Sequence, residues 1–147
     1  MISQSAEPER VVRILNSLLR SEISATESYM QAIPRFSSDV EALREIAREH
    51  GQAVTELRAA IQRAGGIPDE SSGVFPALPL KMVNGPAQVF GDAAALKALK
   101  DVEERALDEY QDAIQRLDGS GISWISDTLI PAQIKHISRI DAQIALL

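Results

Sequence analysis

Four stretches of the chain place apolar residues every three or four positions, the spacing that lines one face of an α-helix. The pattern predicts helices over about 8–33, 38–64, 92–117 and 123–147. Pro131 falls inside the last of these and predicts a kink or a restart of the helix, because proline cannot donate a backbone hydrogen bond. The chain is therefore expected to be all-α.

Residues typical of helix ends mark the boundaries of the first two helices. Pro8 suits the first turn of a helix, and Pro34 stops the first helix. Ser38 and Glu41 form a capping box that predicts the start of the second helix. The glycine pair at 65–66 predicts where that helix ends.

The lengths of the connections predict how the helices are arranged. About five residues join the helices within each half of the chain, so each half is expected to be an antiparallel hairpin. The link over 65–91 is much longer and can cross the length of a bundle. Two hairpins joined by one long crossover make a ferritin-like four-helix bundle, and we expect residues 1–147 to form a single such domain.

The crossover contains apolar side chains, unlike a flexible polar tether. These are Val74, Phe75, Leu78, Leu80, Met82 and Val83. We expect them either to cover the bundle or to form a contact between two copies of the chain. A homodimer through this segment or through helix faces is therefore one expected partner arrangement.

An internal repeat relates the two predicted hairpins. The positions Leu15, Leu18, Glu22, Ala25, Tyr29 and Ile33 recur 81 residues later as Leu96, Leu99, Glu103, Ala106, Tyr110 and Ile114. The pattern places a glutamate of each copy in an apolar helix face. An unpaired buried charge is costly, so each carboxylate needs a partner inside the bundle.

The second helix of each hairpin supplies candidate partners. A shift of 83 residues keeps these helices in register and aligns His50 with Gln133 and Ala53 with His136. In di-iron carboxylate bundles a Glu-x-x-His motif presents a carboxylate and an imidazole from such positions. Both histidines of the chain occupy these positions.

With these features the chain resembles the ferritin-like superfamily and, more narrowly, an uncharacterised bacterial family of such bundles catalogued only as a domain of unknown function. The resemblance rests on the pairs Glu22 with Tyr29 and Glu103 with Tyr110, and on Gly65-Gly66-Ile67-Pro68 followed by Ser72-Gly73. It implies a fold and a metal site without an established reaction.

The ferritin-like motif matches this chain only in part. It would give Glu22 and Glu103 as single carboxylates, and would require carboxylates at positions 50 and 133 and histidines at 53 and 136. Of these four positions only His136 matches. The departure argues against ferroxidase or oxygenase chemistry. Glu49 adjoins position 50 but points about 100° away, on the polar face, and is expected to be solvated.

Three hypotheses for the site follow. In the first, which we favour, Glu22 and Glu103 pair with His50 and His136 in a buried polar layer of a non-catalytic bundle. In the second, the same four residues hold one Fe or Zn ion, with Gln133 or Glu49 as accessory ligands. Imidazole and carboxylate groups both bind such ions.

The third hypothesis is a di-iron oxidase with a two-metal centre completed by water or unexpected ligands. It predicts oxygen consumption with Fe²⁺. No Ser/His/Asp constellation and no glycine-rich nucleotide motif is present, so hydrolase and nucleotide-dependent functions have no support.

Composition limits the partners and the compartment. The net charge of -6, from 15 basic and 21 acidic residues, argues against binding to nucleic acid or to an anionic membrane. The absence of cysteine excludes disulfides and thiolate metal sites. The amino terminus does not resemble a signal peptide, and no apolar run approaches the roughly 20 residues of a membrane span. We expect a cytoplasmic protein.

Overall fold

The computed structural model describes residues 2–37, 39–72, 87–120 and 122–147, and these segments contain helices and no strand. The long helices are α1 (Ile2–Ala32), α2 (Glu41–Arg63), α3 (Ala87–Arg116) and α4 (Ile130–Ala145). A short 3₁₀-helix, η1 (Ile33–Arg35), follows α1, and a π-helix, η3 (Ile125–Leu129), precedes α4. The predicted all-α, four-helix architecture is confirmed.

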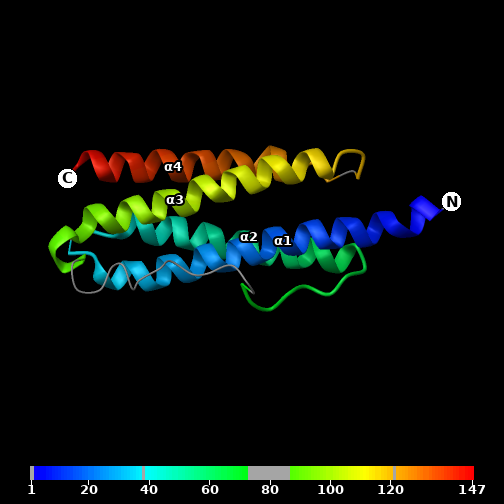
Figure 1. Ribbon diagram of the computed structural model, residues 1–147, viewed down its shortest axis with the longest axis horizontal. Helices are drawn as coiled ribbons and strands as arrows, with labels where there is room; N and C mark the ends of the chain where they lie inside the picture. Colours follow the sequence, from blue (N-terminus) through cyan, green and yellow to red (C-terminus); the bar gives the residue numbers. More distant parts are fainter. Residues whose placement is uncertain (1, 38, 73–86, 121) are drawn as a thin grey trace.

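The helices form two antiparallel hairpins, α1 with α2 and α3 with α4 (Figure 1). Helices α2 and α3 run in the same direction, so the end of α2 and the start of α3 lie at opposite ends of the bundle. The predicted crossover is the segment that connects these two ends. The apolar crossover residues between Val74 and Val83 lie outside the described residues.

The first part of the crossover is held against α1 by polar contacts. The Asn16 side chain donates to the carbonyl of Ile67 at 3.1 Å and accepts from the amide of Asp69 at 2.8 Å. Arg20 forms an ion pair with Asp69. The buried side-chain amide of Asn16 bonds to the backbone through both its nitrogen and its oxygen. It therefore fixes the path by which the chain leaves α2.

Helix α1 begins earlier than predicted. It starts at Ile2, so Pro8 lies inside the helix, and the prediction that Pro8 marks its first turn was wrong. Inside a helix, proline loses one hydrogen bond and crowds the carbonyl four residues earlier, but its φ is helical and these costs do not end α1 at Pro8. Pro34 does end the α-helix, within the 3₁₀ turn η1.

At the start of α2 the structure shows a contact that was not predicted, and at its end it shows the predicted glycine stop. Ser38 of the predicted capping box lies outside the described residues, and the Asp39 carboxylate accepts the amide of Glu41 at 3.0 Å. At the other end, Gly65 has a φ of 82°, a left-handed conformation that glycine adopts without strain. The amide of Gly66 then bonds to Ile61 O at 2.9 Å, so the predicted glycine stop is confirmed.

A break at Gly91 determines where the regular part of α3 begins. Gly91 has a φ of 56° and a ψ of -138°, so the continuous helix starts at Asp92, as predicted. The Asp92 carboxylate accepts the amide of Ser37 at 3.1 Å and joins this start to the turn of the first hairpin. At the far end of α3, the guanidinium of Arg10 donates to the carbonyl of Arg116.

The predicted irregularity at Pro131 takes the form of a restart. The π-helix η3 ends at Leu129, and α4 then begins at Ile130 with Pro131 in its first turn. Since Pro131 has no amide hydrogen to donate to the preceding turn, the helix changes its pitch just before it.

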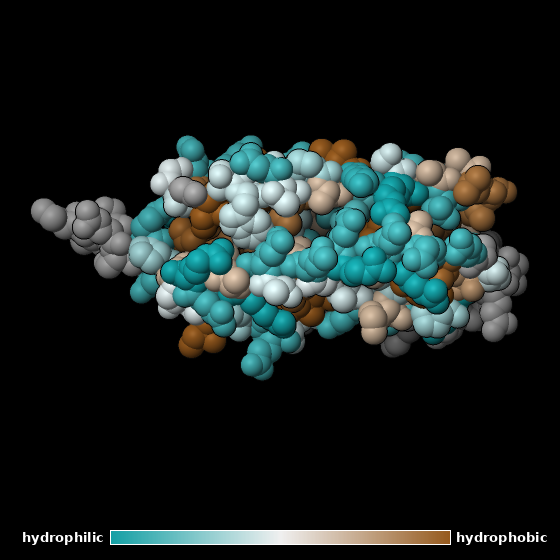
Figure 2. All heavy atoms as spheres, turned by 180° about the vertical axis from the view of Figure 1, so that it is seen from behind, coloured by the Kyte–Doolittle hydropathy of each residue, from teal (hydrophilic) through white to brown (hydrophobic). Residues whose placement is uncertain are grey.

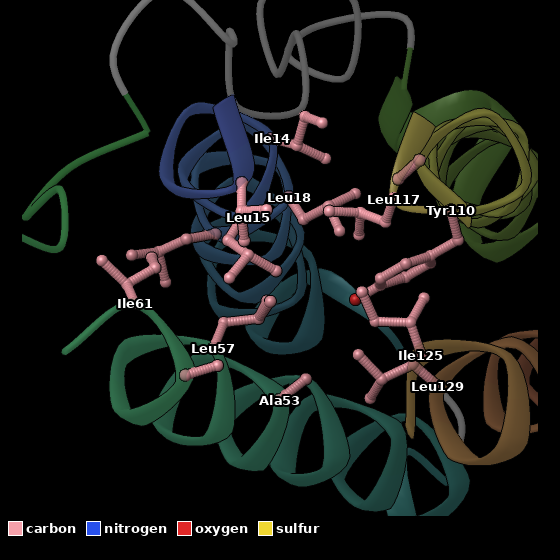
Figure 3. Close-up of a cluster of buried hydrophobic side chains, with 14 of the residues drawn as sticks. Ile14, Leu15, Leu18, Ala53, Leu57, Ile61, Tyr110, Leu117, Ile125 and Leu129 are labelled. Atoms are coloured by element: carbon pink, nitrogen blue, oxygen red, sulfur yellow. The ribbon is translucent and has the colours of Figure 1, made fainter. Parts of the chain in front are cut away.

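The apolar core consists of two clusters at opposite ends of the bundle. The first cluster draws side chains from α1, α2, α3 and η3, including Leu15, Leu57 and Leu117 (Figure 3). The second cluster packs residues of α1, α2, α3 and α4, including Leu43 and Leu99. The two clusters share no residue, and charged and polar side chains occupy the space between them.

None of the helices in the described segments combines the length and the apolar character needed to cross a membrane. The face shown in Figure 2 is mainly hydrophilic, with separate apolar patches and no continuous apolar band. Buried apolar residues form the core of the bundle, and the apolar side chains on this face form only separate patches.

Gly66 and Gly51 provide a matched test of how closely the chain packs at the end of α2. A Cβ on Gly66 would lie 2.5 Å from Val12 Cγ1, whereas a Cβ on Gly51 within α2 would meet nothing within 4 Å. Valine is stiff at χ1, so Gly66→Ala is expected to lower the free energy of unfolding by about 1–3 kcal/mol. Gly51→Ala is expected to raise it by roughly 0.5–1 kcal/mol. Urea denaturation measures both, and equal effects would contradict the close packing of Gly66.

Candidate metal centre

A buried polar layer separates the two apolar clusters. It consists of Glu22 on α1, His50 on α2, Glu103 on α3, and Gln133 and His136 on α4, each no more than 3 % exposed. The structure thus brings together the four residues that the sequence predicted as a site, with Gln133 beside them. His50, and not Glu49, faces the bundle centre.

His50 lies between the two carboxylates of the internal repeat. Its Nδ1 is 2.6 Å from Glu22 Oε2, and its Nε2 is 2.6 Å from Glu103 Oε1. Burial alone would lower the pKa of His50, but the charges of Glu22 and Glu103 outweigh it and raise the pKa well above its ordinary value. Because a carboxylate only accepts hydrogen bonds, both ring nitrogens carry protons and His50 is an imidazolium.

Two tyrosines close the polar layer from opposite sides. Tyr29 on α1 donates to Glu103 Oε1 at 2.6 Å, and Tyr110 on α3 donates to Glu22 Oε1 at 2.5 Å. The pairs cross because α1 and α3 are antiparallel, so the same seven-residue offset on each helix brings its tyrosine level with the other glutamate. Burial, followed by the nearby carboxylates, raises the pKa of both tyrosines well above the ordinary value, and both hydroxyls remain donors.

Glu103 is the most connected carboxylate of the layer. Besides Tyr29 and His50, it accepts a hydrogen bond from the side-chain amide of Gln133, which also donates to Glu103 O at 2.9 Å. Burial alone would raise the pKa of Glu103, but the charge of His50 and the ring nitrogens of His136 and His50 beside its oxygens hold the pKa well below its ordinary value. Glu103 is therefore ionised in the folded protein.

His136 differs from His50 because one of its ring nitrogens has no hydrogen-bond partner. Its Nε2 lies 2.5 Å from Glu49 Oε2, at the edge of the polar layer, where the Glu49 side chain is 38 % exposed. Its Nδ1 is buried, and the nearest carboxylate oxygen, Glu103 Oε2, is 3.5 Å away, too long for a hydrogen bond. Glu49 is thus both partly solvated and bonded to the site.

The donor atoms of three residues are close enough to serve one metal ion. One ligand atom each from His50, Glu103 and His136 lie within 4.8 Å of one another. Two ligand atoms of one tetrahedral ion with bonds of roughly 2.1 Å lie about 3.4 Å apart, so the three side chains would move slightly closer together to hold an ion. Glu22 lies behind this group, on the other ring nitrogen of His50. The two imidazoles and one carboxylate of His50, Glu103 and His136 therefore suit a single ion in their chemistry, with small side-chain movements to close around it.

Two contacts of the layer were not predicted from the sequence. The internal repeat places each tyrosine seven residues after a glutamate, but it did not indicate that each hydroxyl would bond to the glutamate of the other hairpin. The antiparallel direction of α1 and α3, together with the equal spacing of Glu22 to Tyr29 and Glu103 to Tyr110, was the available signal. Glu49 was expected to be solvated, with a role as accessory ligand only in the second hypothesis, and the helical pattern did not indicate that it would bond to His136.

Comparison with protein-family models gives one match. The model described as a domain of unknown function, DUF2383, matches residues 10–116. This range includes Glu22, His50 and Glu103 and ends with α3, before His136. No curated protein and no solved structure is significantly similar to the chain.

The tyrosine hydrogen bonds are expected to differ in their effect on stability. Glu103 Oε1 accepts from both Tyr29 and His50, whereas Tyr110 is the partner found for Glu22 Oε1 in the described part of the chain. Tyr110→Phe should therefore lower the free energy of unfolding by about 1.5–3 kcal/mol, the effect of a hydrogen bond to a charged group. Tyr29→Phe should cost less. Equal losses in urea denaturation would contradict the described pairing.

Proposed function

Because the chain belongs to the DUF2383 family, a family described as a domain of unknown function, we propose its function from the site: it binds one divalent transition-metal ion through His50, Glu103 and His136. The observation that carries the proposal is that Nδ1 of His136 is buried without a hydrogen bond, 3.5 Å from Glu103 Oε2 and close to His50. Buried polar atoms normally have a partner, and an ion would supply one here.

The surroundings of both histidines support the proposal. Histidines that bind metals usually donate their other ring N–H to a carboxylate or a carbonyl, which fixes the tautomer and the ring orientation. Glu22 occupies that position at Nδ1 of His50, and Glu49 occupies it at Nε2 of His136. Each histidine therefore turns one nitrogen toward Glu103 and the other toward an orienting carboxylate.

The charge of the layer also favours a cation. Glu22 and Glu103 are two buried carboxylates, and the imidazolium of His50 is the one cation in direct contact with both among the described residues. A divalent ion in place of the proton on His50 Nε2 would add one positive charge between them. Two imidazoles and one carboxylate suit Zn²⁺ or Fe²⁺, and either ion would supply a Lewis acid at this position.

The arrangement supports a ferritin-like classification with one ion and not two. Two antiparallel hairpins joined by a crossover are the ferritin-like topology, in which Glu-x-x-His motifs complete a two-metal centre. In this chain Ala53 offers no ligand at a motif position, and the amide of Gln133 already donates to Glu103. The ligands for a second ion are therefore missing, and we do not extend the proposal to a di-iron oxidase.

A second candidate function is a self-contained structural layer. It is favoured by the hydrogen bonds within the layer. Every carboxylate oxygen of Glu22 and Glu103 and both ring nitrogens of His50 have a partner without an ion. This alternative predicts no stoichiometric metal and no effect of chelators on unfolding. The single-ion proposal predicts that a free ion concentration of 100 times Kd raises the free energy of unfolding by about 2.7 kcal/mol.

Zinc binding by protein purified without a His-tag tests the proposal. The stripped wild-type chain is expected to bind one Zn²⁺ ion per molecule in calorimetric titration and metal analysis. Glu103→Gln, which keeps the size of the side chain and removes its charge, should abolish this binding. Glu109→Gln is the matched control, since Glu109 is a half-buried carboxylate of the same helix outside the ligand group.

Glu22→Gln distinguishes a ligand from an orienting residue. It is expected to weaken Zn²⁺ binding by roughly 10–100-fold without abolishing it, the usual effect of altering the partner of a metal-bound histidine. Wild-type protein that binds no Zn²⁺, or Glu103→Gln protein that binds it as tightly as wild type, would overturn the proposal. The structural-layer alternative would then stand.

A further inference from the structure

Among the described residues that bond to the polar layer, one carboxylate, Glu49, is exposed to solvent. Glu22, His50, Glu103 and His136 are almost fully buried, whereas Glu49, bonded to His136, is more than one-third exposed. An ion that binds the buried ligands must cross the shell around them. Glu49 marks a place where that shell is thin and negatively charged.

The two ends of the bundle offer no comparable route. One apolar cluster fills the space on each side of the polar layer, and the two contain the tyrosines that close it, Tyr29 and Tyr110. Passage through either cluster would require a hydrated cation to leave water next to apolar side chains, which is strongly unfavourable. The sides of the bundle remain.

Among the sides, α2 and α4 are the neighbouring helices whose backbones approach each other least closely. Each of these helices makes most of its close backbone contacts with its hairpin partner and few with the other. Polar contacts join them instead: Glu49 with His136 and, about one turn away, Glu45 with Arg139. Both glutamates are partly exposed, and Arg139 places a positive charge beside Glu45, about one turn from Glu49.

We infer that metal ions enter and leave the site between α2 and α4, with Glu49 as the first carboxylate that an incoming ion meets. This inference rests on the proposed function. Exposed carboxylates at the mouth of a site raise the local concentration of cations and their rate of association. Arg139 opposes that attraction and ties α4 to α2 through Glu45.

The inference separates two roles for Glu49. As the orienting partner of His136 it would affect how long a bound ion remains, and as the access residue it would affect how fast an ion arrives. Gln at position 49 can still accept the N–H of His136 but carries no charge. Glu49→Gln should therefore lower the association rate constant much more than it raises the dissociation rate constant.

The opposite side of the molecule provides a matched control. Glu109 is a half-buried carboxylate on α3 next to Ser21 of α1, and it lies near Glu22. It thus resembles Glu49 in charge and partial burial but faces the interface between α1 and α3. If ions used that interface, Glu109→Gln would slow their arrival and Glu49→Gln would not.

Lys100 provides a matched control for substitution of Arg139. The ion pair between Lys100 and Asp141, 2.7 Å long, joins α4 to α3 as Arg139 joins it to α2. Arg139→Gln and Lys100→Gln remove the same charge and each break an ion pair of α4. Only Arg139→Gln is expected to speed association.

The experiment is stopped-flow binding of Co²⁺ to the stripped full chain, followed by ligand-field absorption, with chelator displacement for dissociation. Glu49→Gln is expected to reduce the association rate constant by roughly three- to tenfold at low salt, with a smaller difference at high salt. Arg139→Gln should increase it, while Lys100→Gln and Glu109→Gln should leave it near the wild-type value.

The outcomes separate this inference from the proposed function. Wild-type protein that takes up no Co²⁺ would overturn both. Wild-type uptake together with an unchanged association rate in Glu49→Gln would overturn the access route alone, as would a slower association in Glu109→Gln. A change in Glu49→Gln confined to dissociation would show that Glu49 only orients His136.

Discussion

The burial of two carboxylates in the middle of an apolar bundle constrains the whole arrangement. Glu22 and Glu103 have almost no access to water, so protein groups must replace their hydration. His50 contributes a positive charge to both, and tyrosine hydroxyls and an amide provide further donors. Removing one partner from a buried charged pair typically costs about 3–5 kcal/mol, so the layer fixes how the four helices align. The apolar clusters on either side exclude water and strengthen these contacts.

The duplication of the hairpin explains both the symmetry of the layer and its departure from symmetry. The repeated glutamates and tyrosines exchange hydrogen bonds between α1 and α3 in two equivalent pairs. The second helices are not equivalent, because one contributes His50 and the other contributes Gln133 and His136. The ligands therefore gather on the side of Glu103, where His136 Nδ1 makes no hydrogen bond, and Glu22 is left to orient His50. This asymmetry is the physical basis for a site with one ion.

Much of this arrangement could be predicted from the sequence, and its limits have physical causes. Helical spacing places Glu22 and His50 on buried faces, and connection lengths predict the hairpins and the crossover. The start of α1 could not be predicted from Pro8, because proline usually marks the first turn of a helix, whereas here it lies in the second turn. The contact of Glu49 with His136 depends on how closely α2 approaches α4, which no pattern within one helix records. The spacing of residues within one helix predicts which of its faces is buried. Contacts between helices depend on how the helices pack in the bundle.

The ring nitrogens of the two histidines report most directly on the central claim, since the chain contains no other histidine. ¹⁵N NMR of the metal-free protein should show protons on both nitrogens of His50. Addition of one equivalent of Zn²⁺ is predicted to shift the resonances of His50 Nε2 and His136 Nδ1, while His50 Nδ1 and His136 Nε2 keep their protons. Four resonances that remain unchanged at saturating Zn²⁺ would contradict a metal site at His50, Glu103 and His136.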